Sequence, residues 1–140
     1  MRVLAVDYGD ARTGIAISDP TGFLAGETTV IASYRLEVVA EEIANLCAKS
    51  GAELVVVGRP LNMNGTVGER AEKAEGFAAT LREVTGLPVE LWDERLTSVD
   101  ANRILSDAGK KHAKQRARVD AVAASLILEG YLSYMKSRKG

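Results

Sequence analysis

RVLAVDYGDARTGIAISD, residues 2–19, is the stretch that decides the fold. It contains two β-rich runs, residues 2–8 and 13–19, which are separated by a short turn that begins at Gly9. The turn sequence PTG closes the second run, and a third run follows at residues 24–31. Because parallel neighbours require a crossover of about a dozen residues or more, these short connections predict three consecutive antiparallel strands.

Helices and strands alternate through the rest of the chain. Apolar residues recur at three- and four-residue spacing from Leu36 to Cys47, which predicts an amphipathic helix that stops at Gly51. Residues 54–57 form a continuous apolar run, as is typical of a central strand that is covered on both faces. The elements expected after it are a helix at about residues 67–85, a strand at 89–92, a helix from Thr97 or Ser98 to residue 109, and a last helix at about 119–135.

The predicted element order is therefore βββαβαβαα. A meander followed by helix-strand crossovers predicts a three-layer α/β sandwich with a mixed five-stranded sheet, which is the arrangement of ribonuclease H-like domains. At 140 residues the chain has the usual size of one domain, so residues 1–140 are expected to form a single unit. Such a fold hosts many activities, and the function has to be argued from specific residues.

The composition is that of an ordinary globular protein, with 46% hydrophobic and 26% charged residues. Cys47 is the only cysteine, so no intramolecular disulfide can form. Every apolar run is far shorter than the roughly 20 residues that span a bilayer, and the N-terminal sequence lacks the pattern of a secretion signal. We therefore expect a cytoplasmic protein without a membrane segment.

One segment is strongly basic, although the net charge of the whole chain is only −1. Within residues 110–118 there is no acid, and the cations are Lys110, Lys111, Lys114, Arg116 and Arg118. The small net charge argues against a protein that coats nucleic acid through bulk charge, whereas a local basic segment is suited to phosphate contact. The alternative is a solvated loop, and solvation also explains His112 better than a general-base role does.

Acidic residues stand at the ends of three predicted elements. Asp7 ends the first strand, Asp93 and Glu94 end the fifth, and Asp120 begins the last helix. If the first and fifth strands are parallel neighbours, Asp7 and Glu94 share the crevice beyond the carboxyl ends of these strands. The structural alternative is that Asp7 caps the following turn and that Asp120 is an ordinary acid at a helix N-terminus.

Converging carboxylates suggest a metal site, because their mutual repulsion is relieved by a hard cation such as Mg²⁺ or Mn²⁺. Two such ions about 3.5 to 4 Å apart can activate a water and stabilise the leaving oxygen in phosphodiester hydrolysis. Asp7, Glu94 and Asp120 are thus candidates both for metal ligands and for the catalytic residues of a nuclease.

Four segments, in order and spread over nearly the whole chain, resemble the motifs of the YqgF/RuvX family. Residues 7–19 are similar to its DxGxxRxGxAxSD signature, and GRPLNMNGT at residues 58–66 is similar to its GLPLNMDGT loop. DERLT at residues 93–97 matches a third motif, and VDAVAA at residues 119–124 resembles its terminal acidic helix. A single DxG match would be weak, but four ordered matches make the resemblance specific.

This resemblance implies a fold akin to the RuvC resolvases and ribonuclease H, and a nuclease that matures the 5′ end of pre-16S ribosomal RNA. Holliday-junction resolution is the alternative activity proposed for the family. By position, Asp7, Glu94 and Asp120 match the family's catalytic acids. Arg59 and Asn64 replace the usual Leu and Asp: Arg59 adds a charge suited to holding a phosphate, whereas the amide of Asn64 disfavours a metal-ligand role there.

Other polar residues are candidates for contact with the substrate. Arg12 lies where a guanidinium can meet a phosphate, although a pair with Asp10 or Asp19 explains it equally well. Arg70 and Arg95 either contact the substrate or orient neighbouring carboxylates. A polar loop that suits close approach of a nucleic-acid backbone, with a plain turn as the alternative, contains Asn62, Asn64, Gly65 and Thr66.

The expected partner is nucleic acid, either structured RNA such as pre-16S rRNA or branched DNA, bound by a monomer or a homodimer. A non-catalytic nucleic-acid-binding module is a second hypothesis, but phosphate binding alone gains nothing from three converging anions. A third takes residues 7–9 and 13–14 as the phosphate loop of an actin-like ATPase or sugar kinase. That fold closes a cleft between two related domains, and this sequence contains no second DxG strand-turn.

Overall fold

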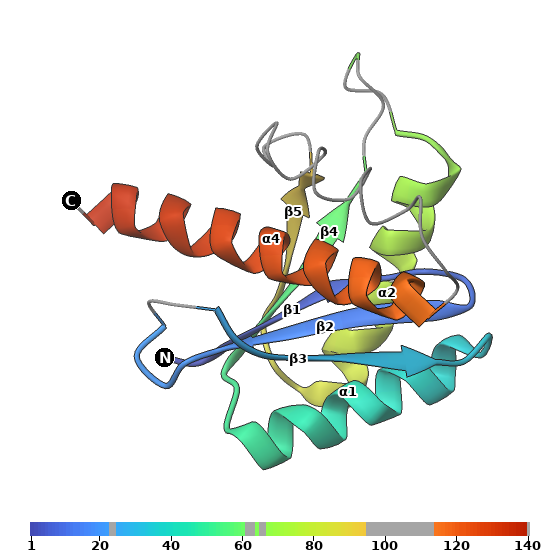
Figure 1. Ribbon diagram of the computed structural model, residues 1–140, viewed down its shortest axis with the longest axis horizontal. Helices are drawn as coiled ribbons and strands as arrows, with labels where there is room; N and C mark the ends of the chain where they lie inside the picture. Colours follow the sequence, from blue (N-terminus) through green and yellow to red (C-terminus); the bar gives the residue numbers. More distant parts are fainter. Residues whose placement is uncertain (23–24, 61–63, 65–66, 95–113, 140) are drawn as a thin grey trace.

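The computed structural model describes residues 1–22, 25–60, 64, 67–94 and 114–139, and for residues 114–120 and 138–139 it describes the backbone alone. Strands and helices alternate much as the sequence predicts (Figure 1). In chain order the described elements are β1 (Val3–Asp7), β2 (Arg12–Ser18), β3 (Ala25–Ala32), α1 (Leu36–Ser50), β4 (Leu54–Arg59), α2 (Glu69–Thr85), β5 (Val89–Asp93) and α4 (Lys114–Lys139).

The strands form one mixed sheet in the order β3-β2-β1-β4-β5. β1, β2 and β3 pair antiparallel, so the predicted meander is confirmed. β4 pairs in parallel with β1, and β5 pairs in parallel with β4, each after a crossover helix. Because β1, β4 and β5 run in the same direction, their carboxyl ends lie at one end of the sheet, together with the turn between β1 and β2.

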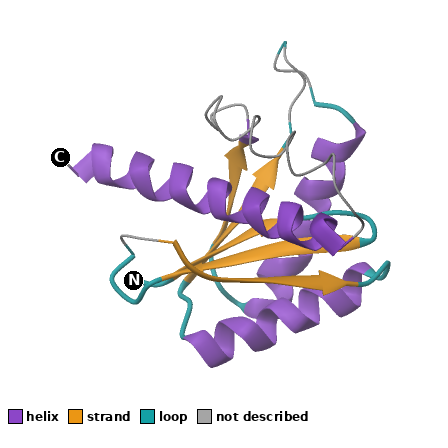
Figure 2. Cartoon of the chain, in the orientation of Figure 1, coloured by secondary structure: helices purple, strands orange, loops and turns teal. Residues whose placement is uncertain are grey.

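Helices cover both faces of the sheet, which gives the predicted three layers (Figure 2). α1 and α2 pack on one face, and α4 crosses the other. Along β4 the side chains alternate: Val55 and Val57 join the core beneath α1 and α2, whereas Leu54 and Val56 join the core beneath α4. All four are at most 6% exposed, which confirms the prediction of a strand covered on both faces.

The last helix begins at Lys114, earlier than the predicted start near residue 119. The sequence KQRAR at residues 114–118 contains good helix formers and neither Gly nor Pro, so the helix continues back into the basic segment. Lys114, Arg116 and Arg118 therefore belong to α4, and the prediction that they lie in a loop was wrong. The helix predicted from Thr97 or Ser98 to residue 109 falls outside the described residues.

The first two helices end where the sequence predicts. Gly51 and Gly86 follow α1 and α2 in the left-handed conformation, with φ of 76° and 69°, and their N–H groups donate to carbonyls of the preceding turn. Cys47 of α1 lies in the core, and burial raises the pKa of its thiol to about 11, as expected for an unreactive core residue. None of the described helices is long and apolar enough to cross a bilayer.

Candidate functional site

The acids predicted to form the site lie at the carboxyl ends of β1 and β5. Asp7 is the last residue of β1, and Glu94 follows Asp93, the last residue of β5. The sequence suggested that β1 and β5 could be parallel neighbours. They are parallel, but β4 lies between them and pairs with both. Asp7 is level with Gly58 and Trp92, and Glu94 follows Trp92 by two residues. Two strand spacings of about 4.8 Å and two residue rises of about 3.3 Å therefore separate the backbones of Asp7 and Glu94 by roughly 12 Å.

Gly58 of β4 lets the side chain of Glu94 reach into this gap. Gly58 is buried and pairs with Trp92 in the sheet. A Cβ atom at this position would lie 3.2 Å from both Cγ and Cδ of Glu94 and 2.5 Å from Cδ1 of Ile127. The Glu94 side chain thus lies over β4, close enough that even a methyl group at position 58 would crowd it. Its carboxyl group is thereby displaced from β5 toward β1.

Asp7 lies on the same face of the sheet as Glu94. Side chains alternate along a strand, and both Val3 and Ala5 of β1 belong to the core beneath α4. The same alternation places Asp7, which is partly buried, on the α4 face. Since Ile127 of α4 also lies against Gly58, the two sheet carboxylates share the face that this helix covers.

The third predicted acid, Asp120, is carried by α4. It lies about one turn before Ala124, which is fully buried, and about two turns before Ile127. The side chain of Asp120 is outside the described part of the structure. Among the side chains that are described, no three from Asp, Glu, His and Cys gather as a metal site.

Glu94 is held in surroundings that disfavour its charge. Burial raises the pKa of its carboxyl group; the charge of Arg70 opposes this rise, and the charge of Asp93 adds to it. The pKa remains raised overall, so the positive charge of Arg70 offsets only part of the cost of burying the ionised carboxylate. A carboxylate of this kind, with oxygen as its donor atom, is suited to a hard cation that supplies the missing positive charge.

The relationship to known proteins follows from the sequence over nearly its full length. Residues 1–134 match the family model described as "RuvX: Holliday junction resolvase". The chain belongs to the RuvX family. Several curated relatives carry the name "Putative pre-16S rRNA nuclease". One of them, from Clostridium acetobutylicum, is 42% identical over 133 residues, which cover 95% of this chain and 98% of the relative. Another, from Halothermothrix orenii, is 43% identical over 140 residues and covers 100% of both chains.

Two solved structures share the fold of this RuvX-family chain. One is T. thermophilus RuvC in complex with a Holliday junction substrate, with a TM-score of 0.63 and 16% identity over 98% of this chain and 97% of that chain. The other is fowlpox virus resolvase in complex with Holliday junction DNA, with a TM-score of 0.55 and 12% identity over 100% of both chains. At these identities the likeness concerns the fold alone, and it confirms the predicted ribonuclease H-like sandwich.

The predicted cations of this RuvX-family chain differ in their surroundings. Arg59, the last residue of β4, forms an ion pair between its Nη1 and Oε1 of Glu75 on α2, at 3.3 Å. Arg70 is exposed near the start of α2, close enough to Glu94 to lower the pKa of that carboxyl group. Arg12 is the first residue of β2 and is partly buried. Of these three arginines, Arg70 is thus the one whose charge acts on Glu94, whereas Arg59 is paired with Glu75 of α2.

A hollow of about 240 Å³ adjoins the turn between β1 and β2, and it is lined by Tyr8, Gly9, Asp10, Arg70 and Lys73. Lys73 Nζ lies 3.2 Å from Oδ1 of Asp10, so α2 is tied to this turn by an ion pair. Lys73 was not among the site residues predicted from the sequence. Its position three residues after Arg70, on the same face of the helix, was the available signal.

For several other residues, contact with the substrate stays a prediction. Asn64 is an exposed turn residue. The cations Lys114, Arg116 and Arg118 lie at the start of α4, with side chains outside the described part. Asn62, Gly65, Thr66, Arg95, Lys110 and Lys111 fall entirely outside the described residues.

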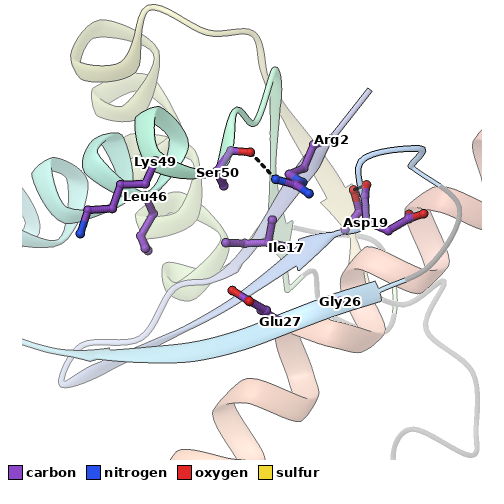
Figure 3. Close-up of a pocket in the computed structure, with 9 residues that line it drawn as sticks. Arg2, Ile17, Asp19, Gly26, Glu27, Leu46, Lys49 and Ser50 are labelled. Carbon is purple, nitrogen blue, oxygen red and sulfur yellow. Dashed lines mark hydrogen bonds between the residues drawn. The ribbon is translucent and has the colours of Figure 1, made fainter.

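A larger hollow of about 410 Å³ lies at the opposite end of the sheet, between α1 and β3 (Figure 3). Arg2, which precedes β1, donates a hydrogen bond from Nη1 to the carbonyl oxygen of Ser50 at the end of α1. Asp19 and Glu27 line the same hollow. None of the predicted site residues lines it, so it is separate from the acidic site.

Proposed function

We propose that this protein is a divalent-metal-dependent nuclease that hydrolyses phosphodiester bonds of RNA in the cytoplasm, with the precursor of 16S rRNA as its substrate. The observation that carries the proposal is the position of Glu94 over Gly58, because it brings a desolvated carboxylate toward Asp7 on the α4 face of the sheet. The names of the curated relatives support rRNA as the substrate.

Asp7, Glu94 and Asp120 would hold the metal. Three carboxylates offer only oxygen donors, which fits Mg²⁺ or Mn²⁺. The negative charge of buried Glu94 is only partly offset by Arg70, which supports a cation beside it. When bound, such an ion polarises the phosphodiester and lowers the pKa of a water molecule.

The remaining parts of the chain would bind and orient the substrate. Arg70 is exposed beside Glu94, and its guanidinium can hold a phosphate with two hydrogen bonds. Ile127 of α4 lies against Gly58 on the same face as the Glu94 side chain and would help to shield that side of the site from water. The basic residues that precede Asp120 on α4, Lys114, Arg116 and Arg118, would contact flanking phosphates.

Four-way junction DNA is the second candidate substrate, and the description of the matching family model favours it. Both substrates present the same phosphodiester to the carboxylates. Discrimination between them therefore depends on contacts to the 2′-hydroxyl group and to the shape of the nucleic acid.

The choice is tested by incubating the native protein with an end-labelled precursor of small-subunit rRNA and, in parallel, with a synthetic four-way DNA junction. We expect cleavage of the RNA near its 5′ end with Mg²⁺ or Mn²⁺, at a rate at least about tenfold above that of the junction, because each specific contact contributes roughly 1 kcal/mol or more. Faster cleavage of the junction would reverse the assignment. Binding of both without cleavage under any metal would instead indicate a binding module.

A further inference from the structure

Tyr34 is the most exposed large hydrophobic residue among those described, with 84% of its surface accessible. It lies in the short connection between β3 and α1. Because so little of the ring is buried, it contributes little to folding and its face is free to contact a binding partner.

The connection that carries Tyr34 is held by hydrogen bonds of the residues immediately before and after it. The N–H of Ser33 donates to the carbonyl oxygen of Ala11 at 3.0 Å, which ties the connection to the turn between β1 and β2. The N–H of Arg35 donates to Oγ of Ser33 at 3.1 Å. In Figure 1 this connection follows the arrowhead of β3, beside the loop that joins β1 to β2. Tyr34 is therefore presented to solvent by an ordered backbone.

Tyr34 lies at the same end of the sheet as the acidic site. Asp7 pairs with Gly14 across β1 and β2, and Gly14 pairs with Val30 of β3, two residues before Ala32. Two strand spacings and two residue rises separate Ala32 from Asp7, which corresponds to about 12 Å. Since Tyr34 follows two residues later, a nucleic-acid strand can reach it within a few nucleotides of a phosphate at Asp7.

Two arginines, Arg35 and Arg12, lie near Tyr34. The Arg35 side chain is 74% exposed, and its contact with Glu37, at 3.8 Å, is a surface pair of small energetic value. Arg12 begins β2 beside the same connection, because it pairs with Ala32. Exposed aromatic rings next to arginines are typical of surfaces on which single-stranded bases stack.

We propose that Tyr34 is a stacking platform for one unpaired base of the RNA strand whose scissile phosphate lies at the acidic site. The inference rests on the proposed function, and it specifies a single-stranded segment a few nucleotides from the cleaved bond. A paired base would offer no free face to the ring, so the platform selects unpaired over duplex sequence on this side of the cut.

The test measures RNA binding in EDTA, apart from cleavage, by the fluorescence anisotropy of a labelled single-stranded RNA. We expect Tyr34→Ala and Tyr34→Leu to weaken binding by about 5- to 100-fold, the usual effect of one stacked base, and Tyr34→Phe to bind like the native protein. Tyr134→Ala is the matched control, because Tyr134 is a 45% exposed tyrosine that packs on Trp92, with ring centroids 5.6 Å apart. It should bind RNA normally.

A second readout locates the stacked base. 2-Aminopurine is placed at successive positions of the RNA, and we expect strong quenching at one position, lost in Tyr34→Ala and kept in Tyr34→Phe. The stacking platform would be overturned if Tyr34→Ala bound RNA like the native protein, or if Tyr34→Ala and Tyr34→Phe lost RNA affinity equally. In either case, cleavage by the native protein would leave the nuclease proposal intact. Absence of both RNA binding and cleavage in the native protein would overturn the two proposals together.

Discussion

Glu94→Gln is expected to reduce cleavage on the order of 10³-fold or more while leaving the protein at least as stable as the native chain. The pKa of the Glu94 carboxyl group is raised mainly by burial, so folding disfavours its ionised form at neutral pH. A neutral amide of the same size removes this cost and also removes the negative charge that the proposed metal would bind. Loss of activity without loss of stability is typical of a residue that is retained for function.

The measurement pairs single-turnover cleavage with thermal unfolding in EDTA. Asp93→Asn is the matched control, because Asp93 is the preceding acid and the alternation of β5 directs it to the opposite face of the sheet. We expect it to retain most of the activity. If Asp93→Asn is inactive and Glu94→Gln is active, the two acids have been assigned the wrong way round.

Gly58→Ala is expected to cause the second-largest loss, at least tenfold in cleavage, by displacing Glu94. A methyl group at this position would lie 3.2 Å from Cγ and Cδ of Glu94 and 2.5 Å from Cδ1 of Ile127. Ile127→Val removes the Cδ1 atom, at a cost of about 1 kcal/mol in stability. The double variant Gly58→Ala/Ile127→Val therefore isolates the contact with Glu94, and we expect it to be as impaired as Gly58→Ala.

Cleavage, Mn²⁺ affinity and RNA affinity in EDTA are measured for these variants and for Ile127→Val alone. We expect cleavage and Mn²⁺ affinity to fall together while RNA affinity stays native. Gly130→Ala is the control for crowding beneath α4, since its methyl group would meet the Trp92 ring at 3.3 Å and not Glu94. Full rescue of Gly58→Ala by Ile127→Val would mean that only the clash with Ile127 matters.

The sequence was sufficient to predict the strands and helices that the structure describes, and the layers that they form. Strand boundaries agree within about two residues, because apolar runs such as residues 54–57 and the turn sequence PTG are local signals. The start of α4 was predicted too late, since the basic residues from Lys114 onward were interpreted by their charge and not by their helix propensity.

The arrangement of the site was less accessible from the sequence. The position of β4 between β1 and β5 is set by long-range strand pairing, which no local pattern reports. The role of Gly58 depends on a side chain that arrives from the neighbouring strand, and the pairing of Arg59 with Glu75 depends on which face α2 turns to the sheet. Asp7 and Glu94 could be singled out from their places at strand ends, whereas Asp120 lies within α4 and not at the helix start where the sequence had predicted it. The catalytic role of the three acids stays a prediction.

Cleavage of an end-labelled small-subunit rRNA precursor by the native protein and by Asp7→Asn, each with Mg²⁺, Mn²⁺ or EDTA, tests the carboxylate-held metal most directly. We expect the native protein to cut only when a divalent ion is present, and Asp7→Asn to bind the RNA without cutting it under any condition. Native-like cleavage by Asp7→Asn, or cleavage that persists in EDTA, would contradict a carboxylate-held metal as the basis of the activity.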